Sequence, residues 1–103
     1  MMQSNSQSIA REILNQLGGQ RFIAMTGARN FLALESGLQF KLPKFDGLRI
    51  NTVRIVLTPA DTYTVEFGRV YGMKYTILSS HDDVYCDMLR ELVESETGLA
   101  LSL

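Results

Sequence analysis

The chain has 103 residues, of which 46% are hydrophobic and 20% charged, and its formal net charge is −1. A chain of this length and composition forms one globular domain with a modest core, which excludes an intrinsically disordered protein. No apolar run approaches the roughly 18 residues that a membrane span needs, and the polar start MMQSNSQS lacks the features of a secretory signal.

The single cysteine, Cys86, excludes an internal disulfide and any metal site built on several thiolates. We therefore expect a cytoplasmic protein that does not enter a membrane. One globular domain is expected over residues 1–103, with residues 1–7 disordered.

The first predicted element is a helix over residues 8–17. Its apolar side chains recur at four-residue spacing, and they are Ile9, Ile13 and Leu17. Serines before it are candidate N-caps, and Gly18-Gly19 supplies the left-handed residue that ends a helix.

Alternating apolar and polar side chains then predict a sheet. The expected strands are residues 22–25, 31–34, 38–42, 52–57, 63–67 and 74–78. Turns are expected at Glu35-Ser36-Gly37 and at Thr58-Pro59-Ala60-Asp61. Gly68 and Gly72, which bracket Arg69-Val70-Tyr71, indicate a bulge or a second reversal. Connections this short favour antiparallel neighbours.

A second helix is predicted to open at Ser80-His81-Asp82-Asp83, because Ser80 and Asp83 resemble a capping box. Gly98 ends it, and its apolar stripe is Val84, Tyr85, Met88, Leu89, Leu92 and Val93. The predicted fold class is therefore α+β, with an N-terminal helix, a five- or six-stranded mainly antiparallel sheet and a C-terminal helix. Both helices are expected on one face of the sheet.

The tail after Gly98 alternates leucine with small residues and carries no charged side chain. Such a segment is expected to dock rather than stay in water. It can fold back on its own domain or lie along the sheet edge of a second copy, and we expect a homo-dimer.

Catalytic chemistry finds little support in the chain. The single histidine, His81, lies five residues before Cys86 on the predicted helix, a spacing that turns the two side chains apart. The run His81-Asp82-Asp83 is interpreted as a helix entry, because three adjacent side chains rarely converge on one metal ion. We expect no catalytic residue, no metal and no cofactor, and hence a protein that is not an enzyme.

Charge is distributed unevenly along the sequence. Residues 21–60 carry six basic side chains against two acidic ones, and residues 61–103 carry three basic against eight acidic. This split can mark a polyanion-binding surface, or it can be an ordinary solvated surface. The cations of the first segment that we consider for binding are Arg21, Arg29, Lys41, Arg49 and Arg54.

Aromatic and basic side chains alternate in the segment from Phe67 to Tyr75. Sheets that bind RNA have this texture, with bases stacked on aromatic rings and phosphates held by cations. Core packing explains Tyr63 and Phe67 equally well, and the order of strands and helices does not match the common RNA-recognition module.

The stretch MTGARNF, residues 25–31, has two interpretations. It can be a turn between two strands, which we prefer, or a site where Thr26, Gly27 and Arg29 hold an anion. The preference rests on the strand-like Phe31-Leu32-Ala33-Leu34 that follows, because anion-binding turns usually lead into a helix. The complete set of candidate ligand-binding residues is Thr26, Gly27, Arg29, Arg49, Arg54, Arg69 and Tyr71.

The opening of the type LGGxRFIAMTGAxNF, which runs from Leu17 to Phe31, resembles a family of small uncharacterised proteins of tailed phages, prophages and conjugative elements. Later segments share the resemblance, and they are Leu38-x-Phe40-Lys41-Leu42-Pro43, Asn51-x-Val53-x-Ile55-x-Leu57, Asp61-x-Tyr63-x-Val65-x-Phe67, Val84-Tyr85-x-Asp87-Met88-Leu89 and Thr97-Gly98-Leu99. The resemblance covers nearly everything from Ile13 onward. It implies a mobile-element origin and carries over no functional residue.

Two functions follow as hypotheses. The first is a non-catalytic, phage- or mobile-element-encoded binding protein that contacts nucleic acid or a protein that handles nucleic acid. The alternative is a phage counter-defence protein that inhibits a host immune protein or sequesters a nucleotide signal through MTGARNF.

Overall fold

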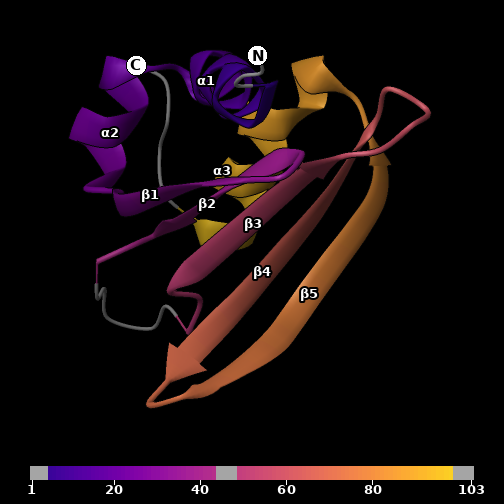
Figure 1. The fold of residues 1–103 in the computed structure, drawn as a ribbon. Coiled ribbons are helices and arrows are strands. Elements are labelled where there is room, and N and C mark those ends of the chain that lie inside the picture. Colours follow the sequence, from indigo (N-terminus) through magenta and orange to yellow (C-terminus); the bar gives the residue numbers. More distant parts are fainter. Residues whose placement is uncertain (1–4, 44–48, 99–103) are drawn as a thin grey trace.

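The computed structural model describes residues 5–43 and 49–98, which form a five-stranded antiparallel sheet packed against helices (Figure 1). Along the chain, the elements are α1 (Asn5–Leu17), α2 (Gln20–Thr26), β1 (Arg29–Leu34), β2 (Gly37–Lys41), β3 (Thr52–Leu57), β4 (Tyr63–Tyr71), β5 (Lys74–Val84), a 3₁₀ turn η1 (Cys86–Met88) and α3 (Leu89–Thr97). The predicted α+β fold, with a helix before and after the sheet, is confirmed.

The strands follow one another in the sheet as they do in the chain, in the order β1-β2-β3-β4-β5. Every neighbouring pair is antiparallel. The turns predicted at Glu35-Ser36-Gly37 and Thr58-Pro59-Ala60-Asp61 lie where the chain reverses between β1 and β2 and between β3 and β4. A reversal between Gly68 and Gly72 is wrong, because Arg69–Tyr71 continue β4 and the chain reverses at Gly72 and Met73, whereas the alternative of a bulge agrees with the register shift between Phe67 and Gly68. The sheet is therefore an antiparallel meander, as expected, although the connection from β2 to β3, residues 42–51, is longer than the others.

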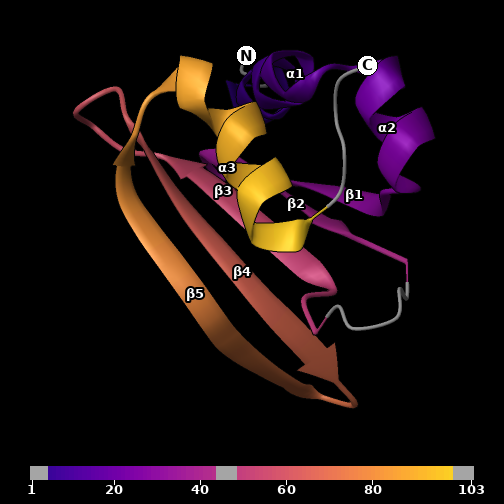
Figure 2. The same cartoon turned by 180° about the vertical axis from the view of Figure 1, so that it is seen from behind.

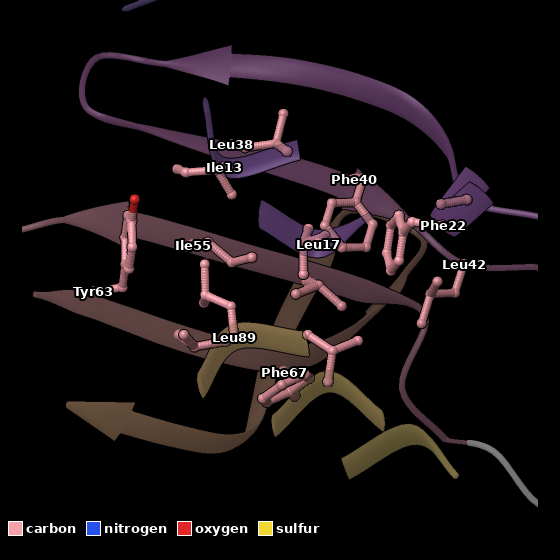
Figure 3. Packing of buried hydrophobic residues seen from close by; sticks show 14 of the residues in the cluster. Ile13, Leu17, Phe22, Leu38, Phe40, Leu42, Ile55, Tyr63, Phe67 and Leu89 are labelled. Atoms are coloured by element: carbon pink, nitrogen blue, oxygen red, sulfur yellow. The ribbon is translucent and has the colours of Figure 1, made fainter. Parts of the chain in front are cut away.

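The core lies between the sheet and the helices (Figure 3). Alternate residues of the central strands point into it, and Phe40, Val53, Ile55, Val65 and Phe67 have no exposed surface. The helices contribute residues that are equally buried, namely Ile13, Leu17, Phe22, Leu89 and Val93. Period-two burial in the strands and four-residue spacing in α1 and α3 are the patterns that the sequence predicted.

The expected strand over residues 22–25 is wrong, because this segment belongs to helix α2. Phe22 and Thr26 are buried at four-residue spacing on one face of the helix. Gly27 ends the helix with φ of 72°, and its N–H donates to the carbonyl of Ile23. The sheet therefore has five strands, and MTGARNF connects a helix to a strand rather than two strands.

The predicted start of the second helix at Ser80 is also wrong. Strand β5 continues to Val84, and α3 begins only at Leu89, after the 3₁₀ turn. His81 is therefore a strand residue and not part of a helix entry. Helix α3 keeps the predicted stripe through Leu89, Leu92 and Val93, and Gly98 ends it as expected.

Both ends of the chain bear on predictions. Helix α1 begins at Asn5, so residues 5–7, expected to be disordered, are helical, and the remainder of the predicted disordered segment lies outside the described residues. The leucine-rich tail beyond Gly98 also lies outside them. The homo-dimer based on that tail stays a prediction.

Candidate nucleic-acid interface

One face of the sheet carries the helices, and no described helix lies on the other (Figure 2). The register places Gln39 opposite Arg54, and Arg54 opposite Glu66. Because directly opposite residues of an antiparallel pair share a face, these side chains cross the sheet in a row. We call this surface the outer sheet face, and its residues are Gln39, Lys41, Thr52, Arg54, Glu66 and Tyr75.

Arg54 is the central cation of the outer sheet face. Its Nε and Nη2 donate to Oε1 of Gln39 at 3.1 and 2.8 Å, which fixes the plane of the guanidinium. The guanidinium carbon lies 5.3 Å from the ring centroid of Tyr75, within the range of a cation–π interaction. Arginine has five N–H donors, and within the described residues only two of them have acceptors.

Gly68 leaves the space in which the Tyr75 ring packs against the sheet. A Cβ at residue 68 would lie 2.6 Å from the Tyr75 ring and 2.7 Å from the carbonyl oxygen of Thr76, so only glycine allows the ring this close. The Tyr75 hydroxyl donates a long hydrogen bond of 3.4 Å to Oε1 of Glu66. Arg54 and Tyr75 therefore form a cation–π pair whose position is set by residues of β2, β3, β4 and β5.

Burial raises the pKa of Tyr75 above its ordinary value of 10.0, and the negative charge of Glu66 raises it further. Because the folded pKa is raised, the protonated phenol stabilises the fold below pH 10, and this contribution is lost as the pH rises through the folded pKa.

Alkaline denaturation tests this arrangement. Melting temperatures recorded from pH 8 to pH 11 are expected to fall above about pH 10 in the wild type, and Tyr75→Phe is expected to make that fall shallower because its ring has no proton to lose. Glu66→Gln should act in the same direction, since it removes the neighbouring negative charge. Equal slopes for all three proteins would contradict the placement of Tyr75 beside Glu66.

Charge is sorted along the strands rather than by sequence half. In an antiparallel meander the start of each strand lies beside the end of the one before it. One end of the strands carries Arg29, Lys41 and Lys74, and the opposite end carries Glu35, Asp61 and Asp82. The basic end adjoins the Arg54–Tyr75 pair, so positive charge is concentrated locally in a protein whose net charge is −1.

The predicted candidate residues fall into separate groups. Arg29 lies opposite Lys41 at the basic end of the outer sheet face. Arg69 donates from Nη1 to the carbonyl of Arg49 at 3.1 Å, which places these two together near the end of β4. Tyr71 lies at the end of the β4–β5 hairpin and is 78% exposed.

Thr26 is the last residue of α2 and Gly27 is its C-cap, two residues before Arg29 in the chain. The Gly27 N–H donates to Ile23, and the Ala28 N–H donates to Oγ1 of Thr26 at 3.1 Å. The Thr26 hydroxyl in turn donates to the carbonyl of Phe22 at 2.7 Å. The backbone amides that an anion would need are already occupied within the turn, and the C-terminal end of a helix carries the dipole charge that disfavours an anion.

Of the residues of the outer sheet face, only Arg54 was in the set of candidate ligand-binding residues. Lys41 was considered as a cation, and the other four, Gln39, Thr52, Glu66 and Tyr75, were not in the set. Tyr75 was considered only as one aromatic residue of the segment 67–75. Gln39 and Glu66 alternate with core residues on their strands, and that alternation is the signal that places them on the solvent face.

His81 has a structural setting that superficially resembles a catalytic triad. Its Nε2 lies 3.0 Å from Oγ of Ser79 and 3.2 Å from Oε2 of Glu96 on α3. A serine–histidine–acid triad needs the serine and the acid on different ring nitrogens. Because both partners contact the same nitrogen, this cluster ties β5 to α3 and does not form a proton relay.

The described part of the chain contains neither a group of side chains that could hold a metal ion nor a helix that could cross a membrane. Its histidine, cysteine and carboxylate side chains form no group of three that can hold a metal ion. Its helices are all too short or too polar to cross a bilayer.

In comparisons with known proteins, no protein-family model matches the chain, and no curated protein and no solved structure is significantly similar to it.

Proposed function

We propose that this protein is a non-catalytic, phage- or mobile-element-encoded protein that binds single-stranded nucleic acid in the cytoplasm through its outer sheet face. The observation that carries the proposal is the Arg54–Tyr75 pair on a sheet face that no described helix covers. Single-strand binding proteins combine such planar groups, on which bases stack, with cations that follow the phosphates.

The chemistry of each side chain supports this role. The guanidinium of Arg54 is held flat by Gln39 and backed by the Tyr75 ring, so its other face is available to a base or its remaining donors to a phosphate. Lys41 and Arg29, opposite each other on neighbouring strands, extend the positive charge along the sheet. Two like charges placed directly opposite destabilise a sheet, and a bound polyanion relieves that cost.

Binding is tested by fluorescence anisotropy with a labelled single-stranded oligonucleotide of mixed sequence at several salt concentrations. The wild type should bind more weakly as salt rises, because phosphate contacts release counterions. Arg54→Ala should weaken binding and reduce the slope of log affinity against log salt by about 0.7, the value for one lost phosphate contact on a single strand.

Two further variants separate geometry from net charge. Arg90→Ala removes the same charge from an exposed residue of α3, on the other side of the sheet, and should bind as the wild type does. Arg54→Lys keeps the charge but lacks the planar fork, and should bind with intermediate affinity. Equal losses for Arg54→Ala and Arg90→Ala would mean that only net charge matters, and a wild type that does not bind at low salt would refute the proposal.

The counter-defence hypothesis, in which MTGARNF holds a nucleotide, gains no support from the turn. The amides of Gly27 and Ala28 have intramolecular partners, and Thr26 is buried with its hydroxyl bonded on both sides. We therefore place ligand binding on the outer sheet face and not in this turn.

A further inference from the structure

The β4–β5 hairpin extends beyond the rest of the sheet (Figure 1 and Figure 2). The last residue pair between β3 and β4 is Thr52 with Gly68, so residues 69–71 of β4 pair only with β5. We call residues 69–77 the arm. A two-stranded hairpin by itself is only marginally stable in water, so an arm that keeps its shape needs support from its base.

Asn51 provides that support. Its side-chain Oδ1 accepts from the N–H of Val70 at 2.8 Å, and its Nδ2 donates to the carbonyl of Val70 at 3.0 Å. The side-chain amide thus takes the place that the backbone of a neighbouring strand would occupy. The bond from Arg69 to the carbonyl of Arg49 adds a second attachment.

The end of the arm is apolar and exposed. Tyr71 is 78% exposed and Met73 is fully exposed, and Ile77, at the base of the arm opposite Gly68, is 51% exposed. Gly72 makes the reversal with φ of 62°, and nothing lies within 4 Å of the position where a Cβ would be. Large apolar side chains grouped on a surface mark a contact site rather than ordinary solvent exposure.

The charge of the arm indicates the chemistry of the partner. From Phe67 to His81 the sequence contains no acidic residue, and the arm carries Arg69 and Lys74. An apolar end flanked by cations is complementary to nucleic acid, where bases lie between negative phosphates. Proteins that bind nucleic acids insert apolar side chains, methionine among them, between neighbouring bases.

The arm is continuous with the outer sheet face. Tyr75 belongs to both, and the register places it opposite Val70. Met73 lies in the turn just before β5, two residues from Tyr75, which is a distance of about 7 Å at about 3.3 Å per residue. A single-stranded nucleic acid bound at Arg54 and Tyr75 would therefore pass directly onto the arm.

We propose that the end of the arm, formed by Tyr71 and Met73, inserts between adjacent bases of the single-stranded nucleic acid held on the outer sheet face and unstacks them. This inference rests on the proposed function, because the outer sheet face supplies the phosphate contacts that hold the strand. The arm supplies apolar contacts that depend little on salt.

A single-stranded oligonucleotide with 2-aminopurine in place of an internal adenine tests the insertion, since unstacking raises the fluorescence of this base. The wild type should raise the fluorescence on binding. The double variant Tyr71→Ala/Met73→Ala should lose the rise and bind about 5- to 150-fold more weakly, the loss expected when a stacked base loses its platform. Its melting temperature should equal that of the wild type, because both side chains are exposed.

The chain contains a matched control in Tyr85→Ala/Met88→Ala, which removes an exposed tyrosine and methionine beside the 3₁₀ turn. This control should keep both the fluorescence rise and the affinity. If the arm variant keeps them too while Arg54→Ala weakens binding, the arm inference fails and the proposed function stands. If the wild type does not bind at low salt, both fail.

Light scattering distinguishes a protein contact from a nucleic-acid contact. The wild type and the arm variant should have the same oligomeric state. A dimeric wild type that becomes monomeric in Tyr71→Ala/Met73→Ala would assign the end of the arm to an interface between copies of the chain and overturn the insertion.

Discussion

Replacing Phe40 by alanine is expected to lower the free energy of unfolding by about 3–5 kcal/mol. Phe40 on β2 is completely buried, and it meets Phe22 of α2 edge to face with ring centroids 5.4 Å apart (Figure 3). Loss of the ring removes apolar contacts from both layers and leaves a cavity that strands and helices cannot close. Since domains of this size have a total stability of about 5–15 kcal/mol, the effect is large.

Phe31 provides the matched control for this measurement. It lies on β1, its ring centroid is 5.5 Å from that of Phe40, and it is 37% exposed. Phe31→Ala should cost much less than Phe40→Ala in urea denaturation followed by circular dichroism, because little apolar surface returns to water. Equal losses for the two variants would mean that the core is not centred on β2.

Elements with a strong period were predictable from the sequence. Helix α1 and strands β2, β3 and β4 have a clear period over most of their length, and most of their buried side chains are apolar residues at the predicted positions. Helix α2 was not, because it is only seven residues long and contains Phe22 and Ile23, which favour strands. The glycines that bound it, at positions 19 and 27, are the local signal that a short helix fits between them.

Strand β5 shows why local patterns misled. Its pairing with β4 shifts by one residue near Leu78 and again near Asp83, which has φ of 56°. Each shift moves the following side chains to the other face of the sheet. The side chain of Tyr75 therefore lies on the outer sheet face, whereas that of His81 lies on the opposite face, in contact with Phe67 and Glu96. A segment whose alternation is broken twice resembles neither a regular strand nor a loop.

Part of the candidate interface follows from turn geometry alone. The turn between β3 and β4 places Leu57 opposite Tyr63, and regular antiparallel pairing from there places Arg54 opposite Glu66. Charge made Arg54 a candidate, but its orientation depends on Gln39 and Tyr75, which come from two other strands. The contact between Arg54 and Gln39 could not be predicted from the sequence because the connection between β2 and β3 is long. The contact between Arg54 and Tyr75 could not be predicted because the register of β5 shifts.

Gly37 illustrates how a correct turn prediction can rest on an incomplete reason. The sequence assigns this glycine to a hairpin turn, where glycine commonly serves by adopting a positive φ. The reversal lies at Glu35 and Ser36, and Gly37 is the first residue of β2, without a positive φ. It lies opposite Val56 on β3 and is buried, so its importance is steric.

Gly37→Ala is therefore expected to destabilise the protein by about 1–3 kcal/mol or more, the usual cost of overfilling a packed site. A Cβ at residue 37 would overlap the carbonyl oxygen of Ile55 and lie 2.9 Å from the Cα of Val56. Both atoms belong to the backbone of a central strand, which cannot move aside without breaking its pairing with β4.

Gly72→Asn is the control, because its site is open and asparagine tolerates a positive φ, and it should change stability little. Thermal unfolding of both variants decides the matter, and a Gly37→Ala protein as stable as the wild type would show that β2 and β3 do not approach this closely.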